Sequence, residues 1–168
     1  MVVNMKSATD VDLEVLDLAT LSWLAGSAAN DHLLAAIRKA GHPQLRISHG
    51  YVFQLLIAAP RTVGEIAESL GVTQQAASKF VAELTSLGYL AVLAEPTDRR
   101  VRRVVLSALG ERAVSDARAA RRKLEKKLAT AVGEDVLLTA RKALIALLEA
   151  TGGLEASQRR RARPPNIL

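Results

Sequence analysis

The sequence contains no cysteine among its 168 residues. That absence excludes disulfide bonds, thiolate metal sites and a peroxide-sensing thiol. Long hydrophobic runs are absent too, because no uninterrupted apolar stretch approaches the roughly 20 residues that a membrane-spanning helix needs. The N-terminus also lacks a basic region followed by an apolar run. We therefore expect a cytoplasmic protein without membrane contact.

Catalytic constellations are missing as well. The chain has no glycine-rich loop that could cradle a phosphate, no Ser-His-Asp or Cys-His set in a recognisable context, and no cluster of carboxylates with histidine. The histidines His32, His42 and His49 have neither cysteine partners nor an i, i+4 spacing, so they predict no metal site. The interpretation is a protein that is not an enzyme and has no cofactor.

Charge is strongly basic and unevenly distributed along the chain. The net charge is +6 and the isoelectric point is about 10.1. Residues 1–37 hold one basic side chain, Lys6, against five acidic ones, whereas most lysines and arginines lie from Lys79 onward. This balance favours a polyanionic partner. The arginine-rich end, residues 159–163, is predicted to be a disordered tail that either adds phosphate contacts or only improves solubility.

Residues 62–90 have the pattern of a helix, a turn and a second helix. Thr62 and Glu65 satisfy a capping box, which predicts that a helix begins here, and Gly71 follows where a left-handed residue commonly ends a helix. Thr73 is then the expected N-cap of a second helix that Gly88 closes. The inward stripe of this second helix is expected to be Ala77, Phe80, Val81, Leu84 and Leu87.

The outward face of the second helix is polar near its N-terminus. Glutamine can pair bidentately with adenine, serine can meet several base edges, and lysine can meet guanine or a phosphate. An ordinary solvated helix face is the alternative, because glutamine and serine are common on any surface. The DNA-binding candidates on this helix are Thr73, Gln74, Gln75, Ser78 and Lys79.

A basic hairpin is predicted directly after the two helices. Residues 89–93 and 103–106 are strand-like, and Pro96 and Asp98 between them are turn formers. Arginines at the tip would reach a narrow minor groove, where negative potential is concentrated; a solvated loop is the alternative. The DNA-binding candidates on this wing are Asp98, Arg99, Arg100, Arg102 and Arg103.

With these motifs the chain resembles the MarR family, the winged-helix regulators of the multiple antibiotic resistance type. The matching segments are TVGEIA, LGVTQQAASKFVAEL, LTSLGYL, the Asp98-Arg99-Arg100 motif, and Val104, Leu106, Ser107 and Gly110 after it. Matching at the level of motifs covers about residues 62–110. The resemblance implies that Arg100 enters the minor groove and that Asp98 orients it.

The helix-turn-helix and the hairpin, residues 62–106, together form the predicted DNA reader. Amphipathic helices are expected on both sides of this reader. Their predicted bounds are Thr9 or Asp10 to Lys39, Leu45 to Ala58, Ser107 to Val132, and Asp135 to Ala150. Neither terminal helix could bury its apolar stripe alone, so we expect them to join their symmetry mates in a homodimer. A monomer with a self-contained helical cap is the alternative.

The predicted fold is therefore mainly α with a small β-hairpin wing, a winged helix-turn-helix flanked by dimerisation helices. The expected domains are an N-terminal dimerisation helix at 1–44, the winged helix-turn-helix at 45–110, C-terminal dimerisation helices at 111–153 and the basic tail at 154–168.

The function that these patterns predict is that of a sequence-specific regulator of double-stranded DNA. Two recognition helices related by twofold symmetry would read a pseudopalindrome in successive major grooves. The flanking helices form a frame around the reader, and this layout suggests a repressor that responds to a small-molecule effector. Aromatic residues make up only 3% of the chain. The candidates for an effector pocket are the few bulky groups near the junction, which can equally be core: Trp23, His32, His49, Tyr51 and Phe53.

Two alternatives to sequence-specific reading remain open. In the first, the winged helix binds a protein partner and its basic charge is incidental; steep salt dependence of DNA binding would exclude this. In the second, the protein coats DNA without regard to sequence, against which the outward glutamines argue.

Overall fold

A computed structural model describes residues 11–95 and 100–158 of the chain. Helices dominate, and the two strands form an antiparallel hairpin. The fold class expected from the sequence, mainly helical with a small hairpin, is confirmed. The elements are η1 (Leu13–Val15), α1 (Leu18–Lys39), α2 (Ile47–Leu56), α3 (Val63–Leu70), α4 (Gln74–Ser86), β1 (Leu90–Ala94), β2 (Arg102–Leu106), α5 (Ala108–Val132), α6 (Glu134–Ala150) and α7 (Leu154–Gln158).

Local capping sets the two helices of the reader. The backbone N–H of Thr62 donates to Glu65 Oε2 at 2.6 Å, and the N–H of Glu65 donates to Thr62 Oγ1 at 3.2 Å. Gly71 ends α3 with φ of 65°, a left-handed conformation that glycine adopts without steric cost. The Thr73 hydroxyl then accepts the N–H of Ala76 and begins α4. The predicted helix-turn-helix is confirmed.

The hairpin is fastened to the reader by a third segment. Leu90 of β1 lies opposite Leu106 of β2, and Ala94 lies opposite Arg102. Arg61, just before α3, bridges to Val104 of β2 through backbone hydrogen bonds of 3.1 and 2.7 Å. The entry to α3 therefore pairs with one strand of the hairpin, and the hairpin cannot swing freely against the helices.

One hydrophobic core joins the helices of the reader to the hairpin. Fully buried side chains from four elements meet in it, including Val52 from α2, Ile66 from α3, Leu84 from α4 and Val104 from β2. Removing such side chains from water contributes about 1.5–3 kcal/mol each. The inward face of α4 is the predicted one, since Ala77, Val81 and Leu84 are buried and Phe80 and Leu87 are half-buried.

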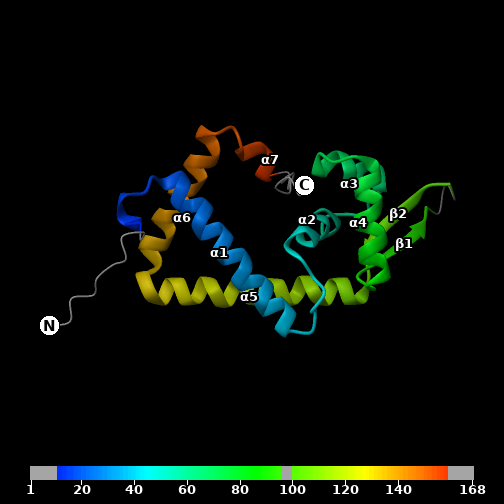
Figure 1. Cartoon of the computed structure of the whole chain (residues 1–168), viewed down its shortest axis with the longest axis horizontal. Helices are drawn as coiled ribbons and strands as arrows, with labels where there is room; N and C mark the ends of the chain where they lie inside the picture. Colours follow the sequence, from blue (N-terminus) through cyan, green and yellow to red (C-terminus); the bar gives the residue numbers. More distant parts are fainter. Residues whose placement is uncertain (1–10, 96–99, 159–168) are drawn as a thin grey trace.

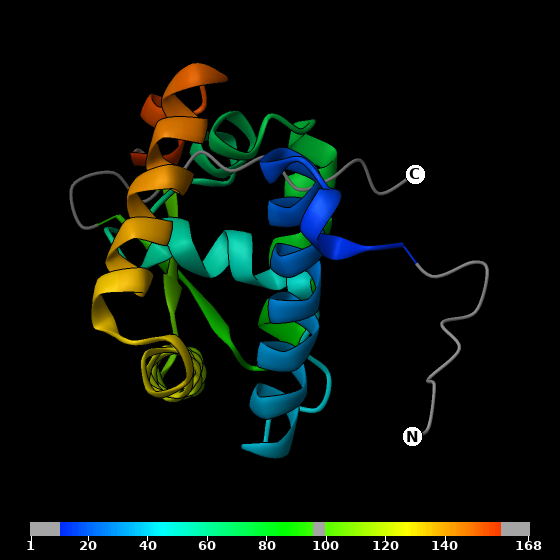
Figure 2. The same ribbon diagram turned by 90° about the vertical axis from the view of Figure 1, so that its left-hand side faces the viewer.

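Helix α5 connects the two ends of the molecule (Figure 1). The reader lies at its N-terminal end, α1 crosses it, and α6 rises from its C-terminal end. Figure 2, which looks nearly along α5, shows α1 and α6 standing apart from each other. Of the helices within residues 11–95 and 100–158, none is long and apolar enough to cross a bilayer.

The structure corrects the expected start of one helix, the expected bounds of a second helix and the expected nature of residues 154–158. The N-terminal helix begins at Leu18, not at Thr9 or Asp10, because Asp17 caps α1 and Asp12 caps the separate turn η1. Helix α2 spans Ile47–Leu56, shorter than the predicted 45–58. The tail expected to be disordered from residue 154 starts with helix α7, and residues 159–168 lie outside the described part.

The start of α5 is clamped against the end of the reader. Ser107 caps α5 by accepting the N–H of Gly110 at 3.1 Å, and its own N–H donates to the Tyr89 carbonyl at 3.0 Å. A Cβ added to Gly110 would lie 2.2 Å from that carbonyl oxygen and 3.2 Å from Leu106. Only glycine lets the first turn of α5 approach the backbone of Tyr89 so closely.

Replacing Gly110 with alanine should therefore destabilise the fold by about 1–3 kcal/mol, because the backbone of Tyr89 has to move. Urea denaturation of the purified protein measures this. Gly64→Ala is the matched control: Gly64 is exposed in the first turn of α3, and its added Cβ would lie no closer than 3.9 Å to Thr62 Oγ1. It should be neutral or stabilising by up to about 1 kcal/mol. Equal effects of the two substitutions would contradict the close approach.

Candidate nucleic-acid interface

The candidate residues of α4 form one exposed surface. Gln74, Gln75, Ser78 and Lys79 are all exposed, on the face opposite to the buried stripe. Within the described residues no hydrogen bond or ion pair holds these four side chains, so they are available to a ligand. Thr73 is exposed as well, but its hydroxyl caps the helix at 3.2 Å from the Ala76 nitrogen. A contact between Thr73 and a ligand would therefore be additional to the role of Thr73 as the helix cap.

The candidate arginines of the hairpin divide into two groups. Arg100 and Arg102 are exposed, and the hairpin that carries them contacts α4 through β1. Arg103 is only half-exposed, because its guanidinium donates to Glu95 and lies 3.4 Å from Glu65 of α3. Its charge is thus compensated near the loop end of the hairpin, where it links β2 to α3. Asp98 and Arg99 lie outside the described residues.

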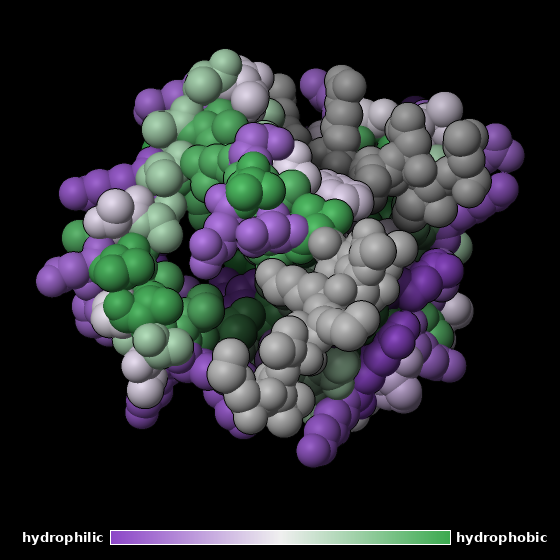
Figure 3. Space-filling view, turned by 60° about the vertical axis from the view of Figure 1, so that its left-hand side comes forward, coloured by the Kyte–Doolittle hydropathy of each residue, from purple (hydrophilic) through white to green (hydrophobic). Residues whose placement is uncertain are grey.

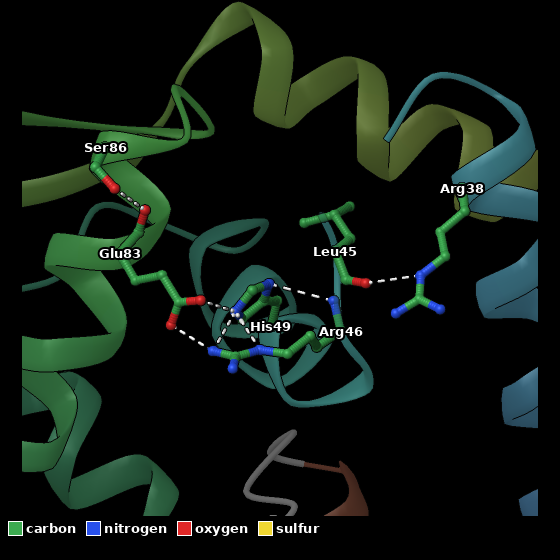
Figure 4. A network of polar contacts seen from close by, with 6 residues as sticks. All are labelled: Arg38, Leu45, Arg46, His49, Glu83 and Ser86. Carbon is green, nitrogen blue, oxygen red and sulfur yellow. Dashed lines mark hydrogen bonds and ion pairs between the residues drawn. The ribbon is translucent and has the colours of Figure 1, made fainter. Parts of the chain in front are cut away.

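A polar network joins the start of α2 to the last turn of α4 (Figure 4). The Arg46 guanidinium forms an ion pair with Glu83 of α4, and its Nη2 lies 3.2 Å from Nε2 of His49. The same His49 nitrogen lies 3.5 Å from the other carboxylate oxygen of Glu83. The Arg46 and Glu83 side chains are 52% and 40% exposed, and ion pairs of such exposure contribute about 0.2–1 kcal/mol. The contact is therefore weak enough to be exchanged.

His49 is the buried member of this network. Burial of the imidazole lowers its pKa below the ordinary value of 6.5, and Arg46 lowers it further, while Glu83 acts in the opposite direction. The folded protein therefore favours the neutral ring. The neutral ring leaves Arg46 as the cationic partner of Glu83 in this network.

A cavity of about 170 Å³ lies between α1, α2 and α5. Of the five residues expected at an effector pocket, His49 and Phe53 lie on its wall. The other three do not. Trp23 is 71% exposed on α1, His32 is exposed on the same helix, and Tyr51 is half-buried against the hydrophobic core.

The sequence reasoning missed three arginines of the cavity wall, Arg46, Arg118 and Arg121. A signal existed for Arg121, which interrupts the apolar spacing of Val114 and Ala117 on α5. A charged residue on an apolar stripe indicates a polar partner or a cavity. No local signal existed for Arg46, because its contact with Glu83 joins positions 37 residues apart in the chain.

Comparison with known families and structures supports the same architecture. The model of the MarR family matches residues 44–101, and no curated protein matches the sequence. RV1404 from Mycobacterium tuberculosis is similar with a TM-score of 0.71 at 20% identity, over 88% of this chain and 99% of that one. YusO from Bacillus subtilis has a TM-score of 0.63 at 22% identity, over 79% and 93% of the two chains. A mutant of MepR from S. aureus bound to an oligodeoxyribonucleotide has a TM-score of 0.59 at 15% identity, over 81% and 99%.

Substitution of His49 should change how stability depends on pH. The unfolded chain takes up a proton near pH 6.5, whereas the buried ring resists it, so the wild type keeps its full stability above that pH and loses stability as the pH falls below it. His49→Gln removes this proton uptake. Urea midpoints measured from about pH 8 to pH 5 should fall less steeply for the variant than for the wild type, and parallel curves would contradict this assignment.

Proposed function

Because this chain is a winged-helix protein of the MarR family, we propose that it is a transcriptional regulator that binds a pseudopalindromic operator as a homodimer. The observation that carries the proposal is the exposed, unpaired polar surface at the start of α4, next to a hairpin with exposed arginines. A helix of this kind fits the major groove, and an adjacent basic hairpin fits the neighbouring minor groove. The net charge of +6 supports a polyanionic partner.

The candidate residues of α4 and those of the hairpin have different roles in this proposal. Gln74, Gln75, Ser78 and Lys79 read base edges or contact phosphates, with Thr73 at the helix start. On the hairpin we assign Arg100 to the minor groove; the family resemblance implies that Asp98, which lies outside the described residues, orients it. Arg99 and Arg102 contact phosphates, while Arg103 holds the hairpin through Glu95 and Glu65. Sequence information thus comes mainly from α4, and the hairpin contributes affinity.

The homodimer is supported by apolar surface at the far end of the molecule. Large hydrophobic side chains of η1, α1 and α6 are exposed, and Figure 3 shows hydrophobic groups gathered on this side. Monomeric proteins rarely expose such contiguous patches. We therefore assign residues 1–44 and 111–153 to dimerisation and 45–110 to DNA binding. The exposed apolar residues are Leu13, Val15, Leu18, Trp23, Leu24, Val136, Leu138, Leu144, Ile145 and Leu148.

A response to a small molecule is the second part of the proposal. The cavity lies between the frame helices α1 and α5 and helix α2, whose first residues contact α4. A ligand there would bind differently to two separations of the reading heads and so shift the equilibrium between them. We propose a repressor that leaves its operator when this cavity is filled.

Selection from a random duplex library at about 0.15 M salt should recover a palindrome whose half-site centres are one helical turn apart, about 34–36 Å. Sedimentation equilibrium should give a dimer, because one chain leaves its apolar surface uncovered. Binding without sequence enrichment would instead indicate architectural coating, and no binding to any duplex would favour a protein partner for the winged helix.

Two substitutions should separate the roles of α4 and the hairpin on the selected operator. Gln75→Ala should cost about 1–3 kcal/mol and relax preference at one base pair, because one bidentate contact is lost. Arg100→Ala should weaken binding to all sequences and flatten the salt dependence, because fewer counterions are released. Lys142→Ala, which removes an exposed charge on α6, is the control; provided that sedimentation equilibrium shows the variant to be dimeric like the wild type, it should change neither property. Unchanged affinity in both test variants would refute this docking geometry.

A further inference from the structure

The net positive charge of this chain lies outside the proposed DNA reader. Residues 62–106, which form the reader, hold five basic and five acidic side chains. Residues 118–127 of α5 differ, because six of these ten residues are basic and only Glu125 is acidic. This short segment therefore has a net charge of +5, against +6 for the whole chain. Apart from residues 159–163, which lie outside the described part, α5 is the place where positive charge is concentrated.

Most of the cations of α5 share one exposed side of the helix. Val114, Ala117 and Leu124 are buried or half-buried and mark the side that is covered, and α5 contacts α1 and α6. The cations lie at helical spacing on the other side. Figure 2 shows α5 almost end-on at a corner of the molecule. The basic face of α5, as we name this surface, consists of five exposed residues: Arg112, Arg122, Lys123, Lys126 and Lys127.

These cations are not compensated by carboxylates. Within the described part of the chain no ion pair includes a member of the basic face. Two acidic residues of α5 that could approach the face have other partners. Asp116 Oδ2 lies 3.0 Å from Nε2 of His42, and Glu125 pairs with Arg141 of α6. The charge of the basic face is therefore available to a ligand.

The spacing of the cations also opposes the stability of α5. Arg122 and Lys126 are four positions apart, as are Lys123 and Lys127, and like charges at this spacing destabilise a helix. Glu134 lines a groove together with Arg122 and Lys126, but it forms no ion pair with either of them. The folded chain thus leaves a repulsion that a polyanion bound to this face would relieve.

The polyanion that fits the basic face best is a nucleic-acid backbone. From Arg112 to Lys126 the face extends over about 21 Å, since each helical residue adds about 1.5 Å. Double-stranded DNA carries one charge per about 1.7 Å of its axis, so several phosphates lie within this length. A membrane surface fits less well, because a helix on a membrane inserts large apolar side chains. The uncharged residues between the outward cations, Ser115 and Ala119, are small.

The basic face lies away from the DNA-reading helix. Arg122 is 14 positions beyond Ala108, the first residue of α5, and therefore about 21 Å along the helix from the end that adjoins the hairpin. Electrostatic interactions are screened over about 8 Å at physiological salt. The face therefore contributes little to binding of the operator at α4, and a duplex that it contacts is a separate stretch of DNA.

We propose that the basic face of α5 is a second DNA-binding surface, which contacts the phosphates of a duplex other than the operator without reading its sequence. The protein thereby bridges two DNA segments, one held by the reader and the other by α5. This inference goes beyond the proposed function, which needs only the reader. Each copy in a homodimer would offer a basic face of its own, because the apolar residues proposed for dimerisation lie on η1, α1 and α6.

The first test measures whether an operator-bound dimer holds a second duplex. Immobilised operator in molar excess over the protein occupies both reading heads, and a fluorescent duplex of unrelated sequence is then added. The wild type should retain the fluorescent duplex at about 0.05 M salt and lose it steeply toward about 0.2 M, because phosphate contacts release counterions. Absence of retention at the lower salt concentration would overturn the proposal.

A variant of the basic face then tests which residues hold the second duplex. It should bind the operator within about twofold of the wild type at about 0.15 M salt and retain the second duplex at least about fivefold less. Sedimentation equilibrium should show the same oligomeric state as for the wild type. This α5 variant combines three substitutions of exposed residues: Arg122→Gln, Lys123→Gln and Lys126→Gln.

The matched control removes three charges from the arginine-rich end of the chain. It should retain the second duplex like the wild type. If the control loses the second duplex while the α5 variant keeps it, the contacts belong to the end of the chain and the proposal is overturned. This control variant combines Arg159→Gln, Arg160→Gln and Arg161→Gln.

A last measurement separates this proposal from the proposed function. Fluorescence anisotropy follows the binding of the unrelated duplex alone to the wild type and to the α5 variant. If no operator can be selected, the proposed function fails, while weaker binding of the unrelated duplex by the α5 variant would still support the second surface. If the operator is bound and both proteins retain the second duplex equally, the regulator stands and the role of the basic face is refuted.

Discussion

Tyr89 is the residue on which the arrangement of the molecule depends. It is 3% exposed, at the junction of α4 and β1. Its carbonyl accepts the N–H of Ser107 and lies against Gly110, which fixes the start of α5. Its hydroxyl lies 3.1 Å from Nδ1 of His42, whose Nε2 lies 3.0 Å from Asp116 of α5. One side chain therefore joins the reader, the turn after α1 and the long helix.

A rigid junction of this kind has a consequence for the candidate interface. The hairpin leads directly into α5. At the other end of α5 the chain continues into α6, which has exposed apolar residues (Figure 1). In a dimer held together at that end, the position of each reading helix would follow from the direction of α5. The distance between the two readers would then be set by packed helices and not by a loop. Small changes at the base of the reader would be transmitted over a long distance, because packed interiors resist compression.

Charge compensation divides the basic residues into structural ones and available ones. Arg103 is compensated by Glu65 and Glu95, and Arg46 by Glu83. The ion pairs of Arg103 fix the hairpin against α3, and the ion pair of Arg46 connects the start of α2 to α4. Lys79 on α4 and Arg118 and Arg121 at the cavity have no ion-pair partner within the described chain. Net charge alone does not distinguish these groups, because the distinction depends on neighbours that are distant in sequence.

Local signals in the sequence determined the reader. The Thr62–Glu65 capping box, Gly71, the Thr73 cap and the apolar spacing of α4 each involve residues within a few positions, so their effect on the backbone could be predicted. The same holds for Ser107 as the start of α5. The helix start at Leu18 was missed because several acidic residues compete as caps, and helix α7 because its apolar pattern is too short to indicate a helix. Only the tertiary structure decided which arginines are paired, that His49 and Phe53 but not Trp23, His32 or Tyr51 line the cavity, and that Arg46 meets Glu83. These contacts join residues far apart in the chain, and their formation depends on the packing of whole helices, which no local pattern specifies.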